Sequence, residues 1–436
     1  MNLLVVSSYY RPAYSYGGPV ESTHRRSLEL ARLGHELTTY TTNANGPGDL
    51  PVPCGQSVKV DGLPVTYYPR WWFGRAKKPS NLFFSPAMGR QLRRLQPRDF
   101  DLILIHAAFC DPGRMAAAAS RRTGIPYFYY THGGYEPWAF NHKYWKKRVY
   151  WELVEKGVLS GAAGIVVCNE SETDLLRGLG LRTPIRRISW GVDIPSAGSS
   201  PARARLAAWF PALADRPFML FLSRLNPKKG LDLLIPTFAA LAREFPDWLL
   251  VLAGPDEGGY QAQLERMVVD RGLKQRILFT GMVTGEAKAA LLAHADCFVL
   301  PSYSEGFPVV VAEAMGYGRP VVITTSCYVP EVAKGEAGLV VSSEVGALAT
   351  ALREMMRDSA FRDQCSQKAI EVAKKYFTWE AVAKQTLSFY REVINSRKKI
   401  NNVNSGNQRF SWRLFSLSDK RWRTYRSSRG RKVSPD

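Results

Sequence analysis

Short runs of apolar residues recur along the chain, and segments long enough for helices separate them. In the first half these runs are LLVVSS, ELTTYTT, DLILIHA, PYFYYTHG and GIVVCNES. In the second half they are FMLFLSR, LLVLAG, ILFTGM, CFVLPSY, PVVITTS and GLVVSS. Strands that are apolar on both faces and alternate with helices are typical of a parallel sheet with helices on each side. The pattern therefore predicts two α/β domains, each built on a doubly wound parallel sheet.

A boundary between the two domains is indicated by local composition. The segment GVDIPSAGSSPARARL gathers Pro, Gly, Ser and Ala after a strand candidate at 185–190 and before a new helix. We therefore place an N-terminal Rossmann-like domain at 1–195 and a C-terminal one at 196–378. Because open α/β sheets bind ligands outside the carboxyl ends of their strands, two such domains predict a ligand cleft between them.

The sequence changes character near its C-terminal end. The amphipathic run TWEAVAKQTLSFYREVI predicts a final helix at 379–395. Over 396–436, Lys and Arg recur among Asn, Ser and Gly, with Asp419 and Asp436 as the acidic residues. This composition predicts a basic, disordered tail.

Composition narrows the class of protein. The 436 residues carry a net charge of +21, which favours anionic partners such as nucleic acid, acidic lipid head groups or phosphorylated substrates. The six cysteines show no C-x-x-C spacing, so we expect a reduced cytoplasmic chain without disulfides or a metal site. No apolar stretch reaches about 18 residues and no leader precedes the first strand-like run, so any membrane contact is expected to be peripheral.

The sharpest chemical signal is the segment PSYSEGFPVVVAEAMGYGRPVV, in which seven residues separate Glu305 from Glu313. We expect Glu305 at a strand end and Glu313 inside the following helix. A carboxylate accepts hydrogen bonds from neighbouring hydroxyls, so the pair suits recognition of a sugar or ribose. The amides of residues 306–309 are expected to open a helix N-terminus that donates to hydroxyls or phosphate. A solvated loop Glu and a helix-capping Glu are the structural alternative.

The second signal is the segment LSRLNPKKGLDLLI, in which Arg224 and Lys229 follow a strand and precede a helix. Arg offers a planar fork and Lys a point charge, and together they could neutralise a departing diphosphate. They would then supply the positive charge that a metal supplies in other enzymes. A basic surface loop is the alternative, because Lys and Arg are usually exposed.

Two loops of the first domain carry weaker signals. Gly17 and Gly18 permit a tight turn and close backbone approach, but a Gly pair is weaker than a G-x-G-x-x-G motif and an ordinary turn is an equal alternative. His132 follows a strand and is flanked by Gly133 and Gly134, so we expect it to face the cleft and hydrogen-bond a sugar. A structural role is the alternative for a lone histidine.

Other catalytic motifs are missing from the sequence. It contains no H-E-x-x-H, Walker lysine loop or G-x-S-x-G elbow, and no Asp-x-Asp placed as a metal clamp. The sequence therefore favours a metal-independent enzyme.

Three segments mix aromatic with basic residues: 70–78, 141–151 and the tail. In the second, helical spacing separates an apolar side from a basic side: Trp145, Val149 and Leu153 against Lys143, Lys146, Lys147 and Tyr150. Such a helix is typical of proteins that lie on an anionic membrane, where each Lys or Arg contributes about 1 kcal/mol. We therefore expect peripheral membrane contact, with solvated charge serving solubility as the alternative.

Taken together, these segments resemble the GT-B glycosyltransferases of family 4, over residues 1–394. GGPVESTHRRSLELARLGHELTTYTT resembles the family's first loop, helix and second strand. SRLNPKKGLDLLI, LAGPDEGG, ILFTGMV and LPSYSEGFPVVVAEAMGYGRPVV resemble the landmarks of its donor domain, in the same order. The resemblance implies a GT-B architecture, with an acceptor-side first domain and a donor-binding second domain facing a central cleft. It also implies that the last helix crosses back onto the first domain.

The resemblance further implies the roles of individual residues. Arg224 and Lys229 would hold the donor diphosphate, Glu313 the ribose hydroxyls, and Glu305 the transferred sugar, while the backbone at 282–283 would meet the base. The residues expected at the donor are Gly17, Gly18, Arg224, Lys229, Met282, Val283, Glu305, Gly306, Phe307, Pro308, Val309 and Glu313. Those expected to act in catalysis are His132, Glu305, Arg224 and Lys229.

The resemblance, together with the missing metal motifs, therefore implies a retaining, metal-independent glycosyltransferase of the hexosyltransferase type. It would move a sugar from a nucleotide-diphosphate sugar to a glycan or lipid-linked acceptor, in the biosynthesis of cell-surface polysaccharide, lipopolysaccharide or glycolipid. The nucleotide sugar is a co-substrate, and no cofactor is expected. Two alternatives stay open: a sugar-nucleotide epimerase or hydrolase with the same fold, and a basic nucleic-acid-binding protein, which accounts for the tail but not for the two-sheet core.

Overall fold

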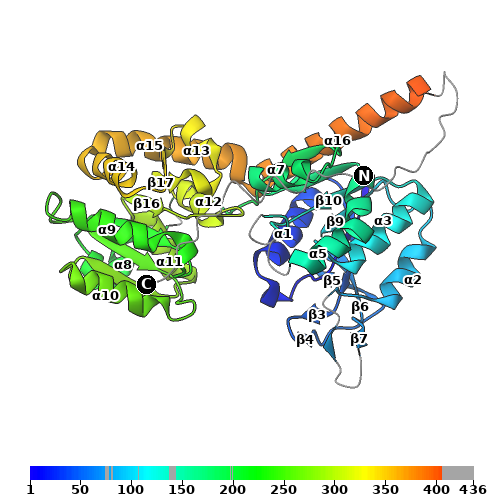
Figure 1. The fold of residues 1–436 in the computed structure, drawn as a ribbon, viewed down its shortest axis with the longest axis horizontal. Coiled ribbons are helices and arrows are strands. Elements are labelled where there is room, and N and C mark those ends of the chain that lie inside the picture. The colour runs from blue at the N-terminus through cyan, green and yellow to red at the C-terminus, as the bar shows by residue number, and fades with distance from the viewer. Residues whose placement is uncertain are drawn as a thin grey trace. The chain divides into compact units, whose positions relative to one another are not determined.

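The computed structural model describes residues 1–73, 78–79, 82–106, 108–136, 144–196, 198 and 200–404. Two sheets organise these residues, one built from strands of the first half of the chain and one from the second half (Figure 1). This confirms the predicted class, two doubly wound α/β domains. Both sheets lie within one compact unit, Met1–Val393, and Ile394–Asp436 forms a second unit. The domain boundaries at 195 and 378 stay predictions.

The first sheet has eight strands in the order β12-β11-β10-β9-β1-β2-β6-β5. Its strands are β1 (Asn2–Ser7), β2 (Glu36–Thr42), β5 (Ser57–Val60), β6 (Leu63–Tyr68), β9 (Leu102–His106), β10 (Tyr127–Tyr130), β11 (Gly164–Val167) and β12 (Ile185–Arg187). All residues of β9, β10 and β11 are buried, as expected for strands with helices on both faces. Two short hairpins lie beside the sheet, β3 (Ala44–Asn45) with β4 (Gly48–Asp49) and β7 (Trp72–Phe73) with β8 (Lys78–Pro79).

One edge of this sheet departs from the parallel prediction. β5 pairs with β6 in antiparallel register, whereas the other neighbouring strands are parallel. The connection is Asp61-Gly62, and both residues have positive φ, 48° and 85°. An Asp-Gly pair with this backbone makes a two-residue hairpin turn. The dipeptide was therefore a readable signal for an antiparallel edge.

The helices of the first half are α1 (Gly18–Arg32), α2 (Pro86–Arg94), α3 (Asp111–Thr123), α5 (Tyr144–Tyr150), α6 (Lys156–Gly161) and α7 (Glu170–Gly178). α3 packs against β1 and β9, and α1 against β2. The side chains of Ser85 and Asn169 cap α2 and α7 by accepting from backbone N–H groups in the first turn. The strand predicted at 185–190 ends at Arg187, and Trp190 packs instead against Gly18.

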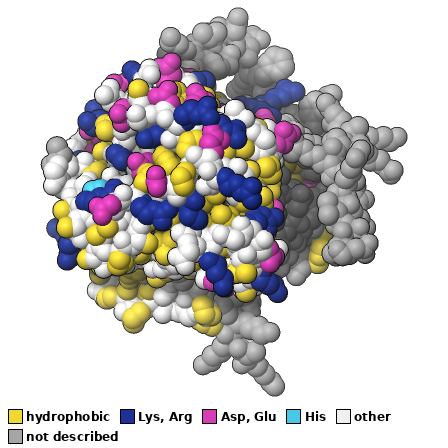
Figure 2. Space-filling model, turned by 90° about the vertical axis from the view of Figure 1, so that its left-hand side faces the viewer, with side chains coloured by type: hydrophobic (Ala, Val, Ile, Leu, Met, Phe, Trp, Pro, Cys, Tyr) yellow, Lys and Arg dark blue, Asp and Glu magenta, His cyan; other side chains and the backbone are white. Residues whose placement is uncertain are grey.

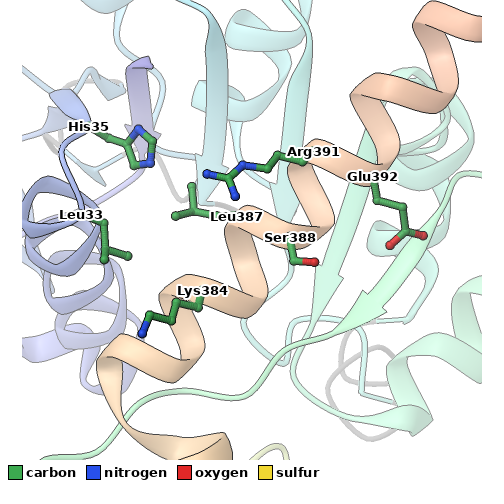
Figure 3. A pocket seen from close by; sticks show the side chains of 7 residues that line it. All are labelled: Leu33, His35, Lys384, Leu387, Ser388, Arg391 and Glu392. Carbon is green, nitrogen blue, oxygen red and sulfur yellow. The ribbon is translucent and has the colours of Figure 1, made fainter.

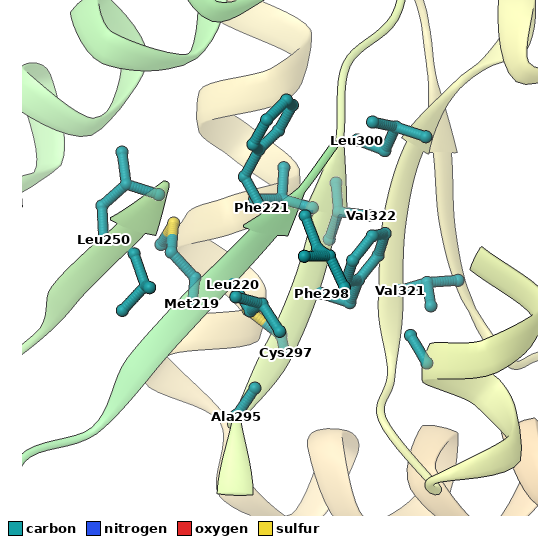
Figure 4. Close-up of a cluster of buried hydrophobic side chains, with 14 of the residues drawn as sticks. Met219, Leu220, Phe221, Leu250, Ala295, Cys297, Phe298, Leu300, Val321 and Val322 are labelled. Atoms are coloured by element: carbon teal, nitrogen blue, oxygen red, sulfur yellow. The ribbon is translucent and has the colours of Figure 1, made fainter. Parts of the chain in front are cut away.

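The second sheet has six parallel strands in the order β15-β14-β13-β16-β17-β18. They are β13 (Phe218–Leu222), β14 (Leu249–Ala253), β15 (Ile277–Gly281), β16 (Cys297–Leu300), β17 (Val321–Thr324) and β18 (Gly338–Val341). Figure 4 shows the buried side chains of the central strands, including Phe221, Phe298 and Val322. This apolar layer fixes the sheet, so the loops at the strand ends are held by a rigid base.

The helices of the second half are α8 (Arg203–Trp209), α9 (Leu231–Leu241), α10 (Tyr260–Asp270), α11 (Gly285–His294), α12 (Val309–Gly316), α13 (Pro330–Lys334), α14 (Val345–Arg357) and α15 (Ser359–Val372). α12 packs on β16 and β17, and α14 on β17 and β18. Helices packed on the strands in this way bury them, as in a doubly wound sheet.

The last helix, α16 (Trp379–Asn404), extends beyond the end predicted at residue 395. Residues 396–404, which we assigned to the tail, therefore continue the helix, because their Lys, Ile and Asn run contains neither Gly nor Pro to end it. The remaining tail residues, 405–436, lie outside the described part of the chain. Within Met1–Val393, Tyr390 of α16 hydrogen-bonds Tyr130 of β10, and Phe389 packs against Phe128 with ring centroids 5.5 Å apart.

Gly230 offers a test of how closely two loops of the second sheet approach each other. A Cβ added at Gly230 would lie 2.0 Å from the carbonyl oxygen of Pro301, whereas a Cβ at Gly272 would meet nothing within 4 Å. The two glycines share nearly the same φ, 70° and 67°. We expect Gly230→Ala to lower the free energy of unfolding by about 1–3 kcal/mol more than Gly272→Ala, because only the first adds a steric overlap. Urea unfolding of both variants measures the difference, and equal losses would contradict this packing.

Candidate active site

The candidate site lies where the strand order of the second sheet reverses. From β13 the chain adds β14 and β15 toward one edge, then returns to add β16, β17 and β18 toward the other. Open α/β sheets bind ligands beside such a reversal, at the carboxyl ends of the strands. The loop after β13 carries Arg224 and Lys229, and the loop after β16 carries Glu305. The topology therefore brings together Lys229 and Glu305, which are 76 residues apart in the sequence.

Lys229 and Glu305 form a buried ion pair. Nζ of Lys229 lies 2.6 Å from Oε1 of Glu305, and the two side chains are 12% and 8% exposed. The hydroxyl of Ser302 donates to the same carboxylate oxygen at 2.5 Å. Because burying a single charge costs several kcal/mol, each member of the pair depends on the other. The sequence predicted both residues at the site but gave no sign of their pairing or of Ser302.

Arg224 lies on the exposed side of the same loop. Its guanidinium hydrogen-bonds Glu257, which also accepts from Nδ2 of Asn226 at 2.8 Å. The side chains of Arg224 and Glu257 are 61% and 40% exposed, and exposed pairs contribute only about 0–1 kcal/mol. Arg224 can therefore exchange Glu257 for an anionic ligand at little cost.

Glu313 forms a separate ion pair. Its Oε1 lies 2.8 Å from Nζ of Lys288 on α11, which the sequence analysis did not single out. Its Oε2 is buried and has no hydrogen-bond partner in the part of the chain that the structure describes, which leaves an acceptor for a hydroxyl group. Met282, 71% exposed, and Val283 follow β15, two strands from β13. The structure thus brings Lys229 and Glu305 into contact. Glu313 lies on α12, the helix after the Glu305 loop, and Met282 lies in the loop after β15.

The backbone after Glu305 differs from the expected helix start. α12 begins at Val309, Pro308 has no N–H group, and the amide of Val309 donates to the carbonyl of Phe307 at 3.0 Å. The prediction that all of 306–309 would offer amides is therefore wrong for two positions. Among the described residues the amides of Gly306 and Phe307 have no hydrogen-bond acceptor, so they could donate to a ligand.

Asn169 of the first domain hydrogen-bonds the backbone at Glu305 and Gly306. Its Nδ2 donates to the carbonyl oxygens of Glu305 and Gly306 at 3.1 and 2.7 Å. Its Oδ1 accepts from the amide of Glu172 at 2.9 Å and caps α7. The signal that could have revealed Asn169 is its position between a buried strand and a helix.

His132 lies in the loop after β10, with a positive φ of 49°. Its Nε2 is 2.9 Å from Nδ1 of His106, and that Nδ1 is also 3.1 Å from the hydroxyl of Thr23. The Thr23 hydroxyl donates to the carbonyl of Pro19 at 2.8 Å, so its oxygen accepts from His106. We therefore assign the proton of His106 to Nδ1, where it faces both the Thr23 oxygen and Nε2 of His132, and the proton of His132 to its own Nδ1.

Both histidines are neutral in this environment. Burial, followed by the positive charge of Arg26, lowers the pKa of His132 to about 3. Burial and the neighbouring His132 lower the pKa of His106 well below its ordinary range. Arg26 itself is buried, lies 4.8 Å from the ring centre of Tyr130 and donates to the carbonyl of Ser189. His132 is therefore a hydrogen-bond donor through Nδ1 rather than a base.

Gly17 and Gly18 lie near His132 through Trp190. Gly17 precedes α1 with a φ of 66°. A Cβ added at Gly18 would lie 2.3 Å from the ring of Trp190, whose centre is 6.2 Å from that of His132. These residues follow β1 and β10, and the strand order of the first sheet reverses between β1 and β9. Gly17 and Gly18 therefore lie at this reversal, and His132, which follows β10, lies one strand beyond it.

A hollow of about 520 Å³ lies away from these residues. Figure 3 shows its lining between the end of α1 and α16: Leu33, His35, Lys384, Leu387, Ser388, Arg391 and Glu392. The predicted site residues do not line it. We therefore assign the ligand to the reversal points and not to this hollow.

Two general features concern metals and membranes. In the described ranges, no three His, Cys, Asp or Glu side chains are grouped as a metal site would require. Among the helices described, none is both long and apolar enough to cross a membrane. On the face shown in Figure 2, Lys and Arg side chains are mixed with Asp, Glu and hydrophobic ones.

Two family models match the chain in sequence order. Residues 16–195 match the model described as Glycosyltransferase Family 4, and residues 209–372 match the model described as Glycosyl transferases group 1. The first match contains Gly17, Gly18 and His132. The second contains Arg224, Lys229, Glu305 and Glu313.

Known proteins agree with these matches. A GDP-mannose-dependent alpha-(1-6)-phosphatidylinositol monomannoside mannosyltransferase of Mycolicibacterium smegmatis is 37% identical over 178 residues, which are 38% of this chain and 46% of that protein. The chain thus spans about half the length of this relative. Glycogen synthase of Mycobacterium tuberculosis is 27% identical over 414 residues, 89% of this chain and 94% of that protein.

Solved structures show the same fold. Anabaena HepE in complex with UDP has a TM-score of 0.67 and 19% identity, covering 90% of this chain and 100% of that one. The neighbours are GT-B glycosyltransferases. The two-sheet architecture, the order of the landmarks and the two family models agree, and the chain belongs to the group 1 glycosyltransferases of family 4.

Proposed function

We propose that this protein is a retaining glycosyltransferase that moves a sugar from a nucleotide-diphosphate sugar to a glycan or lipid-linked acceptor. The observation that carries the proposal is the buried Lys229–Glu305 pair at the reversal of the second sheet. One member is a cation suited to phosphate, and the other is a carboxylate suited to hydroxyls. A nucleotide-diphosphate sugar presents these two kinds of group next to each other.

The donor would extend along the carboxyl edge of the second sheet. Lys229 and Arg224 would contact the diphosphate, with Arg224 leaving Glu257 and Lys229 leaving Glu305. Glu305 and the amides of Gly306 and Phe307 would then bind the transferred sugar. The free oxygen of Glu313 would accept from the ribose, and the backbone at 282–283 would meet the base.

Names of similar proteins support a nucleotide sugar but not one base. The mycobacterial mannosyltransferase is described as GDP-mannose-dependent, and HepE was solved with UDP. The choice among bases in this chain therefore stays open.

Catalysis would consist of electrostatic stabilisation and alignment. Charge would develop on the diphosphate as the bond to the sugar breaks, and Arg224 and Lys229 would stabilise it without a metal. His132 would donate from Nδ1 to a sugar hydroxyl and orient it, because its pKa of about 3 makes it a poor base. Retention would follow from attack by the acceptor on the same face as the departing diphosphate.

The acceptor and the pathway are finer proposals. We place the protein in the biosynthesis of cell-surface polysaccharide, lipopolysaccharide or glycolipid, on the cytoplasmic face of a membrane. Hydrolysis or epimerisation of the donor without an acceptor is the enzymatic alternative. Nucleic-acid binding does not account for the Lys229–Glu305 pair.

An exposed apolar stripe supports contact with a membrane. Trp145, Val149 and Leu153 are 67%, 53% and 78% exposed and recur at helical spacing through α5 and the π-helical turn Trp151–Glu155. An amphipathic helix usually buries its apolar side, whereas this one presents it to solvent. Lys143, part of segment 70–78 and residues 405–436 lie outside the described residues, so the basic side predicted with them is not tested. We propose that the stripe inserts into the surface of an anionic membrane.

Removal of Lys229 should abolish most transfer. Loss of one such donor typically lowers kcat about 100- to 1000-fold, so we expect the folded Lys229→Ala protein to lose transfer by that factor. Its melting temperature should also fall, because Glu305 loses its buried partner. The matched control is Lys368→Ala, because Lys368 forms an exposed pair with Glu371. Initial rates with the nucleotide sugar that the wild type uses measure both variants. Near-normal turnover of Lys229→Ala would refute the assignment.

His132 should stay neutral at physiological pH. Its folded pKa of about 3 lies below the ordinary 6.5, so the unfolded chain takes up the proton first and the contribution of the neutral ring to stability falls as the pH drops below 6.5. Between pH 8 and 5 we expect the NMR ring signals of His132 in the folded protein to show the neutral Nδ1–H form throughout. A titration with its midpoint near 6.5 would show instead that the ring is solvated.

The apolar stripe should govern vesicle binding. We expect the triple variant Trp145→Ser, Val149→Ser, Leu153→Ser to bind vesicles of phosphatidylglycerol and phosphatidylcholine at least about tenfold more weakly, because each side chain contributes roughly 1 kcal/mol or more on burial. The control is Val269→Ser with Val345→Ser, which alters exposed apolar residues of the second domain. Both keep the basic tail. Equal sedimentation of the triple variant and wild type would disprove the surface.

A further inference from the structure

A carboxylate that the sequence analysis did not single out lies beside the candidate site. Glu136 follows His132 by four residues, and its amide donates to the carbonyl of Gly133 at 3.2 Å. The residue is 8% exposed. The loop that presents His132 therefore folds back and buries a second potential sugar ligand next to it.

The Glu136 carboxylate lies directly against the backbone after Glu305. A Cβ added at Gly306 would be 2.2 Å from Oε1 of Glu136. Oε2 of Glu136 is 3.6 Å from Nζ of Lys228, the residue before Lys229. Two carboxylates, Glu136 and Glu305, and two ammonium groups, those of Lys228 and Lys229, thus meet at Gly306.

The carboxylate has unused capacity to accept hydrogen bonds. Nζ of Lys228 lies 3.6 Å from Oε2 and offsets the charge of Glu136. A carboxylate has about four acceptor positions, so contact with one ammonium group leaves others for a ligand. Burial raises the pKa of Glu136, Lys228 lowers it and the nearby Glu305 raises it again. A buried carboxylate held in this way is costly unless hydrogen-bond donors reach it. Hydroxyl groups of a sugar are such donors.

We propose that Glu136 is a sugar-binding residue of this enzyme, contributed by the first domain. It accepts hydrogen bonds from hydroxyls of the transferred sugar bound over Gly306, opposite Glu305. The missing side chain of Gly306 lets the carboxylate lie against this backbone, beside the proposed sugar position. This inference rests on the proposed function, because it assigns Glu136 to the sugar of the same donor.

A charge-removing substitution tests the proposal. Glu136→Gln keeps the size of the side chain and removes the charge, and Glu136→Asp keeps the charge at shorter reach if the first variant folds poorly. We expect Glu136→Gln to lower kcat/KM for the nucleotide sugar about 10- to 100-fold, the range for hydrogen bonds to charged groups. Its affinity for the nucleoside diphosphate alone, measured by calorimetry, should stay within about twofold of wild type. The control is Glu244→Gln, because Glu244 pairs with Arg353 and Arg357 in the second domain, away from the candidate site.

A second variant separates sugar binding from ion pairing. Lys228→Met removes the partner of Glu136 and leaves the carboxylate. If Glu136 acted only through the ion pair, Glu136→Gln would have no further effect in the Lys228→Met background, and that result would overturn the proposal. We expect a further loss of at least about fivefold in the double variant.

The proposed function and this inference fail in different ways. A wild-type protein that transfers no sugar from any nucleotide sugar would remove the proposed function and this inference with it. A wild type that transfers sugar while Glu136→Gln keeps kcat/KM within about twofold would remove only the inference.

Discussion

The ion pair between Lys229 and Glu305 is the contact on which the site depends. Each residue lies in the loop after a different strand, and the two loops meet because β13 and β16 are neighbours in the sheet. The buried apolar strands beneath them fix the loops, and Gly230 lies so close to the carbonyl of Pro301 that no side chain fits between. The pair therefore holds a cation and a carboxylate at one point. A phosphate could replace Glu305 as the partner of Lys229, and sugar hydroxyls could replace Lys229 as the partner of Glu305.

Side-chain contacts also fix the candidate residues of the first domain. His132 is fixed by a chain of hydrogen bonds from Pro19 through Thr23 and His106, which assigns its proton to Nδ1. Burial and Arg26 keep the ring neutral. The first domain therefore offers an oriented neutral imidazole and the carboxylate of Glu136, whereas the second offers the two cations Arg224 and Lys229. This division suits an enzyme that orients a sugar with groups of the first domain and stabilises a departing diphosphate with cations of the second.

Much of this arrangement could be predicted from the sequence, and the failures have physical causes. Apolar runs predicted the strands because buried parallel strands carry that pattern. Spacing and residue type indicated Lys229 and Glu305. Their ion pair could not be predicted, because it depends on the order of the strands in the sheet. The sequence analysis missed Lys288, Glu257 and Asn169. Each contacts a predicted site residue from a segment distant in the sequence, and only the folded chain brings the two together. The hairpin at Asp61-Gly62 was readable and was overlooked.

The most direct test is a crystal structure of the protein with a bound nucleoside diphosphate. The account predicts that the diphosphate lies within hydrogen-bond distance of Arg224 and Lys229, with Nζ of Lys229 moved away from Glu305 and Glu305 left free toward the sugar position. A diphosphate bound elsewhere, with the Lys229–Glu305 pair intact at 2.6 Å, would contradict it.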